Sequence, residues 1–102
     1  MKEEIKKLMM KIIVLLAESD EALWVNRFEW LNSCIDTHYD DALYEIKQLF
    51  GSANSFNDLI LHRNGYMLKK ENDELSSLQD ELYSLLKKEI ANRNAICGKN
   101  DI

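Results

Sequence analysis

The sequence predicts an all-α protein that forms one small domain of four main helices over residues 1–102. The chain has 102 residues, of which 46% are hydrophobic, and this content suits a single core. Proline is absent and glycine occurs three times, which leaves little of the turn chemistry that an all-β domain needs. Apolar residues recur at helical spacing in four segments. We expect helices at about 2–18, 20–36, 38–50 and 68–95, with a short irregular or helical strap over 52–65.

The first helix should have the widest apolar face. Its core-facing stripe follows the three-four spacing of an amphipathic helix and consists of Ile5, Leu8, Met9, Ile12, Ile13 and Leu16. Met10, Val14 and Leu15 widen this face beyond one stripe. We therefore expect more than one neighbouring element to bury them.

The second helix should begin after the capping residues Ser19 and Asp20, with Glu21 near the positive end of its dipole. Its apolar stripe consists of Trp24, Phe28, Leu31 and Ile35. Trp30 lies on the flank of this stripe, so it fits neither the apolar nor the polar face.

The third and fourth helices repeat this spacing. The stripe of the third consists of Tyr39, Ala42, Leu43, Ile46, Leu49 and Phe50. The stripe of the fourth consists of Leu75, Leu78, Leu82, Leu85, Leu86 and Ile90. Gly51 and Gly98 are well placed to end these two helices. Asn64 and Gly65 predict a turn between them, because this pair accepts positive φ.

The charge of the chain is strongly asymmetric, although the net charge is only −5. Residues 1–17 carry four lysines against two glutamates, whereas residues 18–45 carry eight acids against a single arginine. Pairing of the second and third helices would bring Asp36, Asp40 and Asp41 to one end, with Glu45 a turn further on. Such a surface repels nucleic acid and attracts a basic protein surface. The alternative is that these carboxylates only favour helix dipoles and solubility.

No residue pattern is typical of an active site, so we expect a protein that is not an enzyme and holds no metal or cofactor. Asp58 and His62 are four residues apart, but two ligands fall short of a metal site. The chain has no glycine-rich phosphate loop and no GxSxG turn. The basic residues are scattered among acids, which argues against nucleic-acid binding. The first helix is basic and amphipathic, but a core explains its apolar face better than a membrane does.

Two features favour a cytoplasmic location. Cys34 and Cys97 stand far apart without CxxC spacing, which indicates unpaired thiols in a reducing compartment. The apolar run over 12–17 imitates a secretion signal, but Glu3 and Glu4 precede it, and Lys11 interrupts the longer apolar stretch over 8–17. This run is also too short to span a bilayer.

Several motifs resemble a group of small bacterial helical proteins with an FG…SFNDL signature. They are Phe50-Gly51-Ser52, the run from Ser55 to His62, Asn64-Gly65, the run from Glu71 to Leu75, and Leu82-Tyr83. A Trp-bearing helix, here the one with Trp24 and Trp30, precedes the signature. The resemblance extends over about 15–92 and implies a helical fold. Within the signature we expect structural roles: Phe56 and Leu59 in the core, and Asn57 and Asp58 as local backbone hydrogen-bonders.

In size, acidity and lack of an active site, the chain is also similar to immunity proteins of contact-dependent growth inhibition and related polymorphic toxin systems. Such proteins bind basic nuclease toxins and cover the active site or the substrate surface. The resemblance implies a partner with a basic surface, the C-terminal domain of a cognate toxin, expected to be a ribonuclease. The expected toxin-binding residues are Glu29, Trp30, Asp36, Asp40, Asp41, Tyr44 and Glu45, with Trp30 as an aromatic anchor.

The alternative is a structural or regulatory module that self-associates through its first or last helix. Its acidity would then serve solubility alone. The sequence leaves the oligomeric state open, with a monomer favoured.

Overall fold

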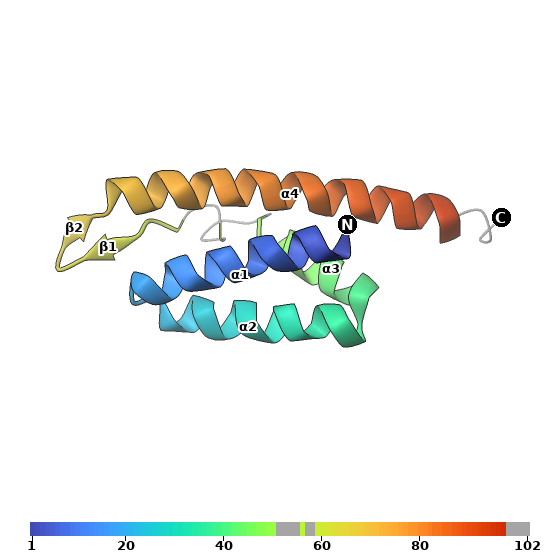
Figure 1. Ribbon diagram of the computed structural model, residues 1–102, viewed down its shortest axis with the longest axis horizontal. Helices are drawn as coiled ribbons and strands as arrows, with labels where there is room; N and C mark the ends of the chain where they lie inside the picture. The colour runs from blue at the N-terminus through green and yellow to red at the C-terminus, as the bar shows by residue number, and fades with distance from the viewer. Residues whose placement is uncertain (51–55, 57–58, 98–102) are drawn as a thin grey trace.

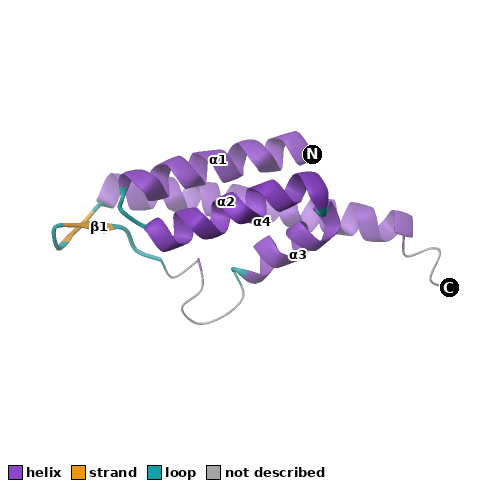
Figure 2. Ribbon diagram, turned by 90° about the horizontal axis from the view of Figure 1, so that it is seen from below, coloured by secondary structure: helices purple, strands orange, loops and turns teal. Residues whose placement is uncertain are grey.

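Four amphipathic helices pair their apolar stripes in an antiparallel bundle, and a small β-hairpin lies at one end of it (Figure 1). The computed structural model describes residues 1–50, 56 and 59–97, and of 95–97 only the backbone. In this part of the chain the helices are α1 (Lys2–Glu18), α2 (Ala22–Thr37), α3 (Tyr39–Gln48) and α4 (Lys69–Cys97). Both α1 and α3 pack against α2 and α4 (Figures 1 and 2). The predicted all-α fold is therefore confirmed.

The core is built from the stripes that helical periodicity predicts. All six stripe residues of α1 are buried, and the other helices contribute Phe28, Leu31, Ile35, Ala42, Leu43, Ile46, Leu75, Leu78, Leu82, Leu86 and Ile90. Trp24, Tyr39 and Leu85 are partly buried against them. Burial of one such large side chain stabilises the fold by about 1.5–3 kcal/mol. Tertiary packing therefore holds these helices more strongly than their intrinsic propensity does.

The outer side of α1 departs from the prediction. Leu15 is buried, but Met10 and Val14 are 49% and 51% exposed. As expected, α1 packs against more than one neighbour, α2 and α4, but the expected burial of Met10 and Val14 was wrong. The arc of α1 outside these two contacts stays open to solvent, with Met10 at the edge next to α2, where Asn32 contacts it.

Phe56 completes the core beyond the end of α3, which stops at Gln48. Its side chain is fully buried, as expected. Three rings surround it, with centroid distances of 4.7 Å to Phe28, 5.3 Å to Trp24 and 5.5 Å to Phe50. The Phe56 N–H donates to the Leu49 carbonyl at 2.8 Å, and Nε2 of Gln79 donates to the Phe56 carbonyl at 2.8 Å. Phe56 is thus fixed to the bundle through both its ring and its backbone.

A two-residue turn joins the strands β1 (His62–Arg63) and β2 (Tyr66–Met67) in an antiparallel hairpin. Asn64 and Gly65 have φ of 54° and 82°, as the common two-residue hairpin turn with two positive φ angles requires. The turn predicted at Asn64-Gly65 is confirmed. The hairpin itself was not expected, because strands this short leave no alternating pattern in the sequence.

Asn72 of α4 holds the backbone that leads into this hairpin. The Leu61 N–H donates to Asn72 Oδ1 at 2.7 Å, and Asn72 Nδ2 donates to the Leu61 carbonyl at 3.0 Å. The Leu68 N–H donates to the same carbonyl at 3.0 Å. The amide of Asn72 therefore pairs with Leu61 as a neighbouring strand would.

The expected caps at Gly51 and Gly98 and the expected backbone hydrogen bonds of Asn57 and Asp58 lie outside the described residues. Leu59, expected in the core, is partly buried against it.

The connection between α1 and α2 closes the first helix rather than opening the second. Asp20 has a φ of 59°, its N–H donates to the Ala17 carbonyl, and the Glu21 N–H donates to the Leu16 carbonyl. This pair of bonds is the Schellman arrangement that ends helices. The buried Ser19 donates its hydroxyl to the Leu15 carbonyl at 3.0 Å. The predicted capping of the second helix by Ser19 and Asp20 was wrong, because their hydrogen bonds serve α1.

Candidate functional site

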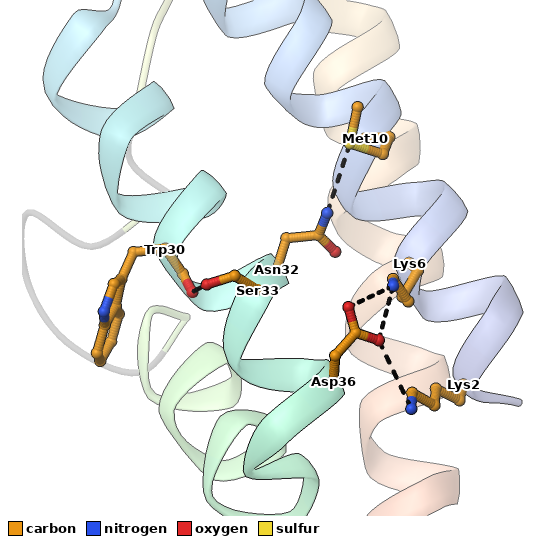
Figure 3. Close-up of polar contacts among 7 residues, drawn as sticks. All are labelled: Lys2, Lys6, Met10, Trp30, Asn32, Ser33 and Asp36. Atoms are coloured by element: carbon orange, nitrogen blue, oxygen red, sulfur yellow. Dashed lines mark hydrogen bonds and ion pairs between the residues drawn. The ribbon is translucent and has the colours of Figure 1, made fainter.

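Three of the seven residues predicted to bind a partner contact other helices of the bundle. Asp36 faces α1, where its carboxylate accepts hydrogen bonds from Lys6 Nζ at 2.7 and 2.8 Å and lies 3.6 Å from Lys2 Nζ (Figure 3). The hydrogen bond from Lys6 lowers the pKa of the Asp36 carboxyl below its ordinary value. Asp36 therefore joins α2 to α1 and is already neutralised within the chain.

Asp40 and Tyr44 face α4. The guanidinium of Arg93 forms an ion pair with Asp40, with Nη2 at 3.1 Å from Oδ2, and its hydrogen bonding lowers the pKa of that carboxyl. The Tyr44 hydroxyl donates to Asn94 Oδ1 at 3.2 Å. Both residues therefore join α3 to α4.

Tyr39 lies within the same cluster at the start of α3. Its hydroxyl donates to a Glu89 carboxylate oxygen, and the Arg93 guanidinium lies 4.9 Å from its ring centroid. Burial, with a further contribution from the Glu89 hydrogen bond, raises the pKa of the Tyr39 hydroxyl. These contacts make this end of the bundle a structural ion-pair network.

All seven predicted residues are exposed, and the other four are Glu29, Trp30, Asp41 and Glu45. None of the ion pairs found in residues 1–50, 56 and 59–97 involves any of these three carboxylates. Trp30 is 59% exposed, and Figure 3 shows its indole pointing away from α1. The Ser33 hydroxyl donates to the Trp30 carbonyl at 2.7 Å, which is a contact of the backbone and leaves the ring free.

Two hollows flank the Trp30 ring between α2 and α3. The larger, about 410 Å³, is lined by Arg27, Trp30, Leu31, Glu45, Gln48 and Leu49. The smaller, about 140 Å³, is lined by Trp30, Cys34, His38, Asp41, Ala42 and Glu45. Trp30 and Glu45 line both hollows. We call Trp30, Asp41 and Glu45, with these two hollows, the Trp30 surface.

Asp41 and Glu45 stand four residues apart on α3, so their carboxylates share one face of the helix. Like charges at this spacing destabilise a helix by about 0.2–0.5 kcal/mol. Asp41 also lies in the first turn of α3, where the helix dipole favours a carboxylate, but Glu45 lies beyond that turn and forms no ion pair among the described residues. Their arrangement is suited to a cation that comes from outside the chain.

Sequence reasoning did not identify Arg27, Cys34, His38 and Gln48 as lining residues. Three of them follow from helical spacing around Trp30. Arg27 lies three residues before it, Cys34 four residues after it, and His38, at the end of α2, eight residues after it. Gln48 is three residues after Glu45 on α3 and would have followed in the same way. The spacing was informative, but a search for acidic residues passed over these positions.

The chemistry available here is recognition of a surface. Among the residues that the structure describes, no three His, Cys, Asp or Glu side chains come together as metal ligands would. His62 is exposed and its Nδ1 lies 3.0 Å from the Ile60 carbonyl, while Asp58, its suggested partner, is outside the described residues. No helix within the described ranges combines the length and apolar character needed to cross a membrane.

Comparison with protein families places these elements in a known group. The model described as Domain of unknown function (DUF6966) matches residues 17–69, just over half of the chain, and so includes α2, α3, the hairpin and the whole Trp30 surface. Neither the curated proteins nor the solved structures gave a match. The chain belongs to the DUF6966 family.

Proposed function

We propose that the protein is an immunity protein that binds a cognate antibacterial toxin domain through the Trp30 surface. Binding neutralises the toxin by covering its active site or its substrate surface. The observation that carries the proposal is an exposed tryptophan between two hollows, beside two carboxylates that lie outside every ion pair of the described residues.

Each part of this surface suits a basic protein partner. Tryptophan is enriched among the residues that carry most of the binding energy at interfaces, where it is surrounded by contacts that exclude water. Asp41 and Glu45 offer acceptors for arginine or lysine, and the Trp30 ring offers a face on which such a cation can lie. The excess of acids over 18–45 also attracts a basic domain at a distance and speeds the encounter.

A toxin that cleaves RNA must bind phosphates, so its active site is basic. An acidic protein that covers this site competes directly with the substrate. Glu29, one residue before Trp30, extends the negative surface along α2. In this proposal Asp36, Asp40 and Tyr44 hold the helices that carry the surface and make little direct contact with the toxin.

The test uses the C-terminal domain of the large secreted protein that we expect the gene immediately upstream to encode. Co-expression of the full chain should protect cells from this domain, and in vitro the chain should abolish RNA cleavage at one equivalent. Trp30→Ala should lose protection and inhibition. Tyr66→Ala should keep both, because Tyr66 is an aromatic residue of the hairpin, 77% exposed against 59% for Trp30, and lines neither hollow.

Protection by Trp30→Ala equal to that of the wild type would contradict the proposed surface. Failure of the wild-type chain to bind the upstream domain would contradict the immunity function itself.

A further inference from the structure

The outer side of α1 is a second surface that the fold leaves open. Met10 and Val14 are half exposed there, next to a hollow of about 310 Å³ with a mainly apolar lining. This hollow is lined by Met10, Lys11, Val14, Leu15, Glu18 and Glu74. Asn32 Nδ2 donates to Met10 Sδ at 3.4 Å, which fixes the methionine on the side of α1 that faces α2 (Figure 3).

The charges around this apolar pair are divided along the helix. Lys7 and Lys11 lie towards the N-terminal end, whereas Glu18 lies at the C-terminal end with Glu74 of α4 beside it. These four side chains take part in none of the ion pairs among the described residues. These charges are therefore free of ion pairs with described side chains, and Lys11 borders the same hollow as Glu18 and Glu74.

The C-terminal half is not explained by the stability of α1. In the N-terminal half, Glu3 lies four residues before Lys7 and favours the helix, whereas Lys11 lies four residues after Lys7 and disfavours it by a similar amount. Glu18 stands in the last turn, where the helix dipole favours a base, and that turn contains no basic residue.

The pattern is complementary to itself. At a rise of about 1.5 Å per residue, Lys7 and Glu18 lie about 8 Å on either side of the point between Ile12 and Ile13. Met10 and Val14 lie within about 4 Å of the same point. A second α1 that lies antiparallel to the first, with its own midpoint facing this point, places its Glu18 beside Lys7 of the first helix. Its Lys7 then lies beside Glu18 of the first helix.

We propose that the occupant of this surface is a second copy of the chain, docked on α1 about a two-fold axis. Met10 and Val14 form the apolar centre, and two symmetry-related pairs of Lys7 with Glu18 flank it, as an isologous interface requires. Lys11 lies about 2 Å along the helix from the two-fold axis, so both copies of its ammonium group must extend to the rim of the interface. Residues 2–6 extend past the end of the partner's α1, because the partner's chain turns away after Glu18. An anionic membrane fits less well, since Glu3 and Glu18 lie on the same outer side of the helix.

This interface leaves the Trp30 surface accessible. The outer side of α1 and the groove between α2 and α3 lie on different sides of the bundle (Figures 1 and 2). The dimer therefore presents two Trp30 surfaces. The monomer favoured by the sequence becomes the dissociated form at low concentration.

The experiment is sedimentation velocity of the full chain over a concentration series that reaches the millimolar range. The wild type should form a reversible dimer. Lys7→Glu alters both symmetry-related pairs, as does Glu18→Lys, so each should raise the dissociation constant roughly tenfold or more. The double variant Lys7→Glu/Glu18→Lys should dimerise like the wild type, and an equimolar mixture of the two single variants should form a heterodimer.

A wild type that stays monomeric throughout the series would overturn the proposal. So would single variants that associate like the wild type, or a double variant and a mixture that fail to restore association. Thermal unfolding at low concentration controls for the fold: both single variants should remain helical, and Glu18→Lys should be at least as stable as the wild type because it places a base in the last turn.

Discussion

Truncation of Phe56 should affect mainly the stability of the fold, and truncation of Trp30 should affect mainly the binding of the partner. Phe56 is fully buried among three rings, whereas Trp30 is 59% exposed. We expect Phe56→Ala to lower the free energy of unfolding strongly and Trp30→Ala to lower it little. Binding of the partner should show the reverse order.

The magnitudes follow from the buried area. Removal of the Phe56 ring loses roughly 150 Å² of buried apolar surface. At about 25 cal/mol per Å², this loss corresponds to about 4 kcal/mol of unfolding free energy. Truncation of a buried phenylalanine typically costs about 3–5 kcal/mol, and the three ring contacts favour the upper part of this range, about 4–5 kcal/mol. For Trp30 less than half of the side chain is buried, so we expect at most about 2 kcal/mol.

The assay is urea unfolding followed by far-UV circular dichroism, since the second substitution removes a fluorophore. A domain of this size has about 5–15 kcal/mol of stability, so Phe56→Ala remains measurable or unfolds outright. If it unfolds, Phe56→Leu gives a second measurement at a lower cost, about 1–2 kcal/mol. The dependence on urea should keep its slope if only stability has changed. Equal losses for Phe56→Ala and Trp30→Ala would refute the assignment of Trp30 to a binding surface.

Three further outcomes follow from single contacts. Asp20→Gly should raise the free energy of unfolding by about 0.5–1 kcal/mol, because Asp20 has a positive φ that glycine adopts freely. Thermal unfolding measures this effect, with Asp20→Ala as a control that should not be stabilised. Asn72→Ala should cost about 1–3 kcal/mol and speed hydrogen exchange at the Leu61 amide, which loses its acceptor. Because the pKa of Asp36 is lower in the folded than in the unfolded chain, its ion pair stabilises the fold at pH values above the unfolded pKa of about 3.9. This contribution is lost as pH falls through the lowered pKa of the folded chain. Acid titration of the unfolding free energy should therefore show a shallower decline for Asp36→Asn than for the wild type between about pH 5 and 2.

The helices were predictable because their evidence is local. The stripe of α1 from Ile5 to Leu16 repeats along the helix, and its burial follows directly from that spacing. The tip of the hairpin was equally local, since only Asn64 and Gly65 needed to accept positive φ. The same spacing could not decide how far the neighbours of α1 reach around it, so Met10 and Val14 were assigned to the core.

The polar contacts were not predictable for the opposite reason. Asp36 pairs with Lys6, which is 30 residues away, and Asp40 pairs with Arg93, which is 53 residues away. No local pattern couples such positions, and a count of charges over 18–45 treats every acid alike. The bundle geometry separates the exposed acids that form ion pairs with other helices, Asp36 and Asp40, from the exposed acids that form none. This separation is what narrows the predicted site to the Trp30 surface.

The contrast between these two groups of acids gives the most direct test of the proposed surface. We propose measuring the affinity of the full chain for the upstream toxin domain, at two salt concentrations, for two double variants that each remove two negative charges. Asp41→Asn/Glu45→Gln alters the Trp30 surface, and Asp36→Asn/Asp40→Asn alters the ion pairs between helices.

We expect Asp41→Asn/Glu45→Gln to weaken binding by about tenfold or more and to reduce its dependence on salt. Asp36→Asn/Asp40→Asn should lower stability but leave affinity within about twofold of the wild type, since these acids are already paired within the chain. Equal effects of the two double variants on affinity would show that overall charge governs binding, and would contradict a defined surface at Trp30.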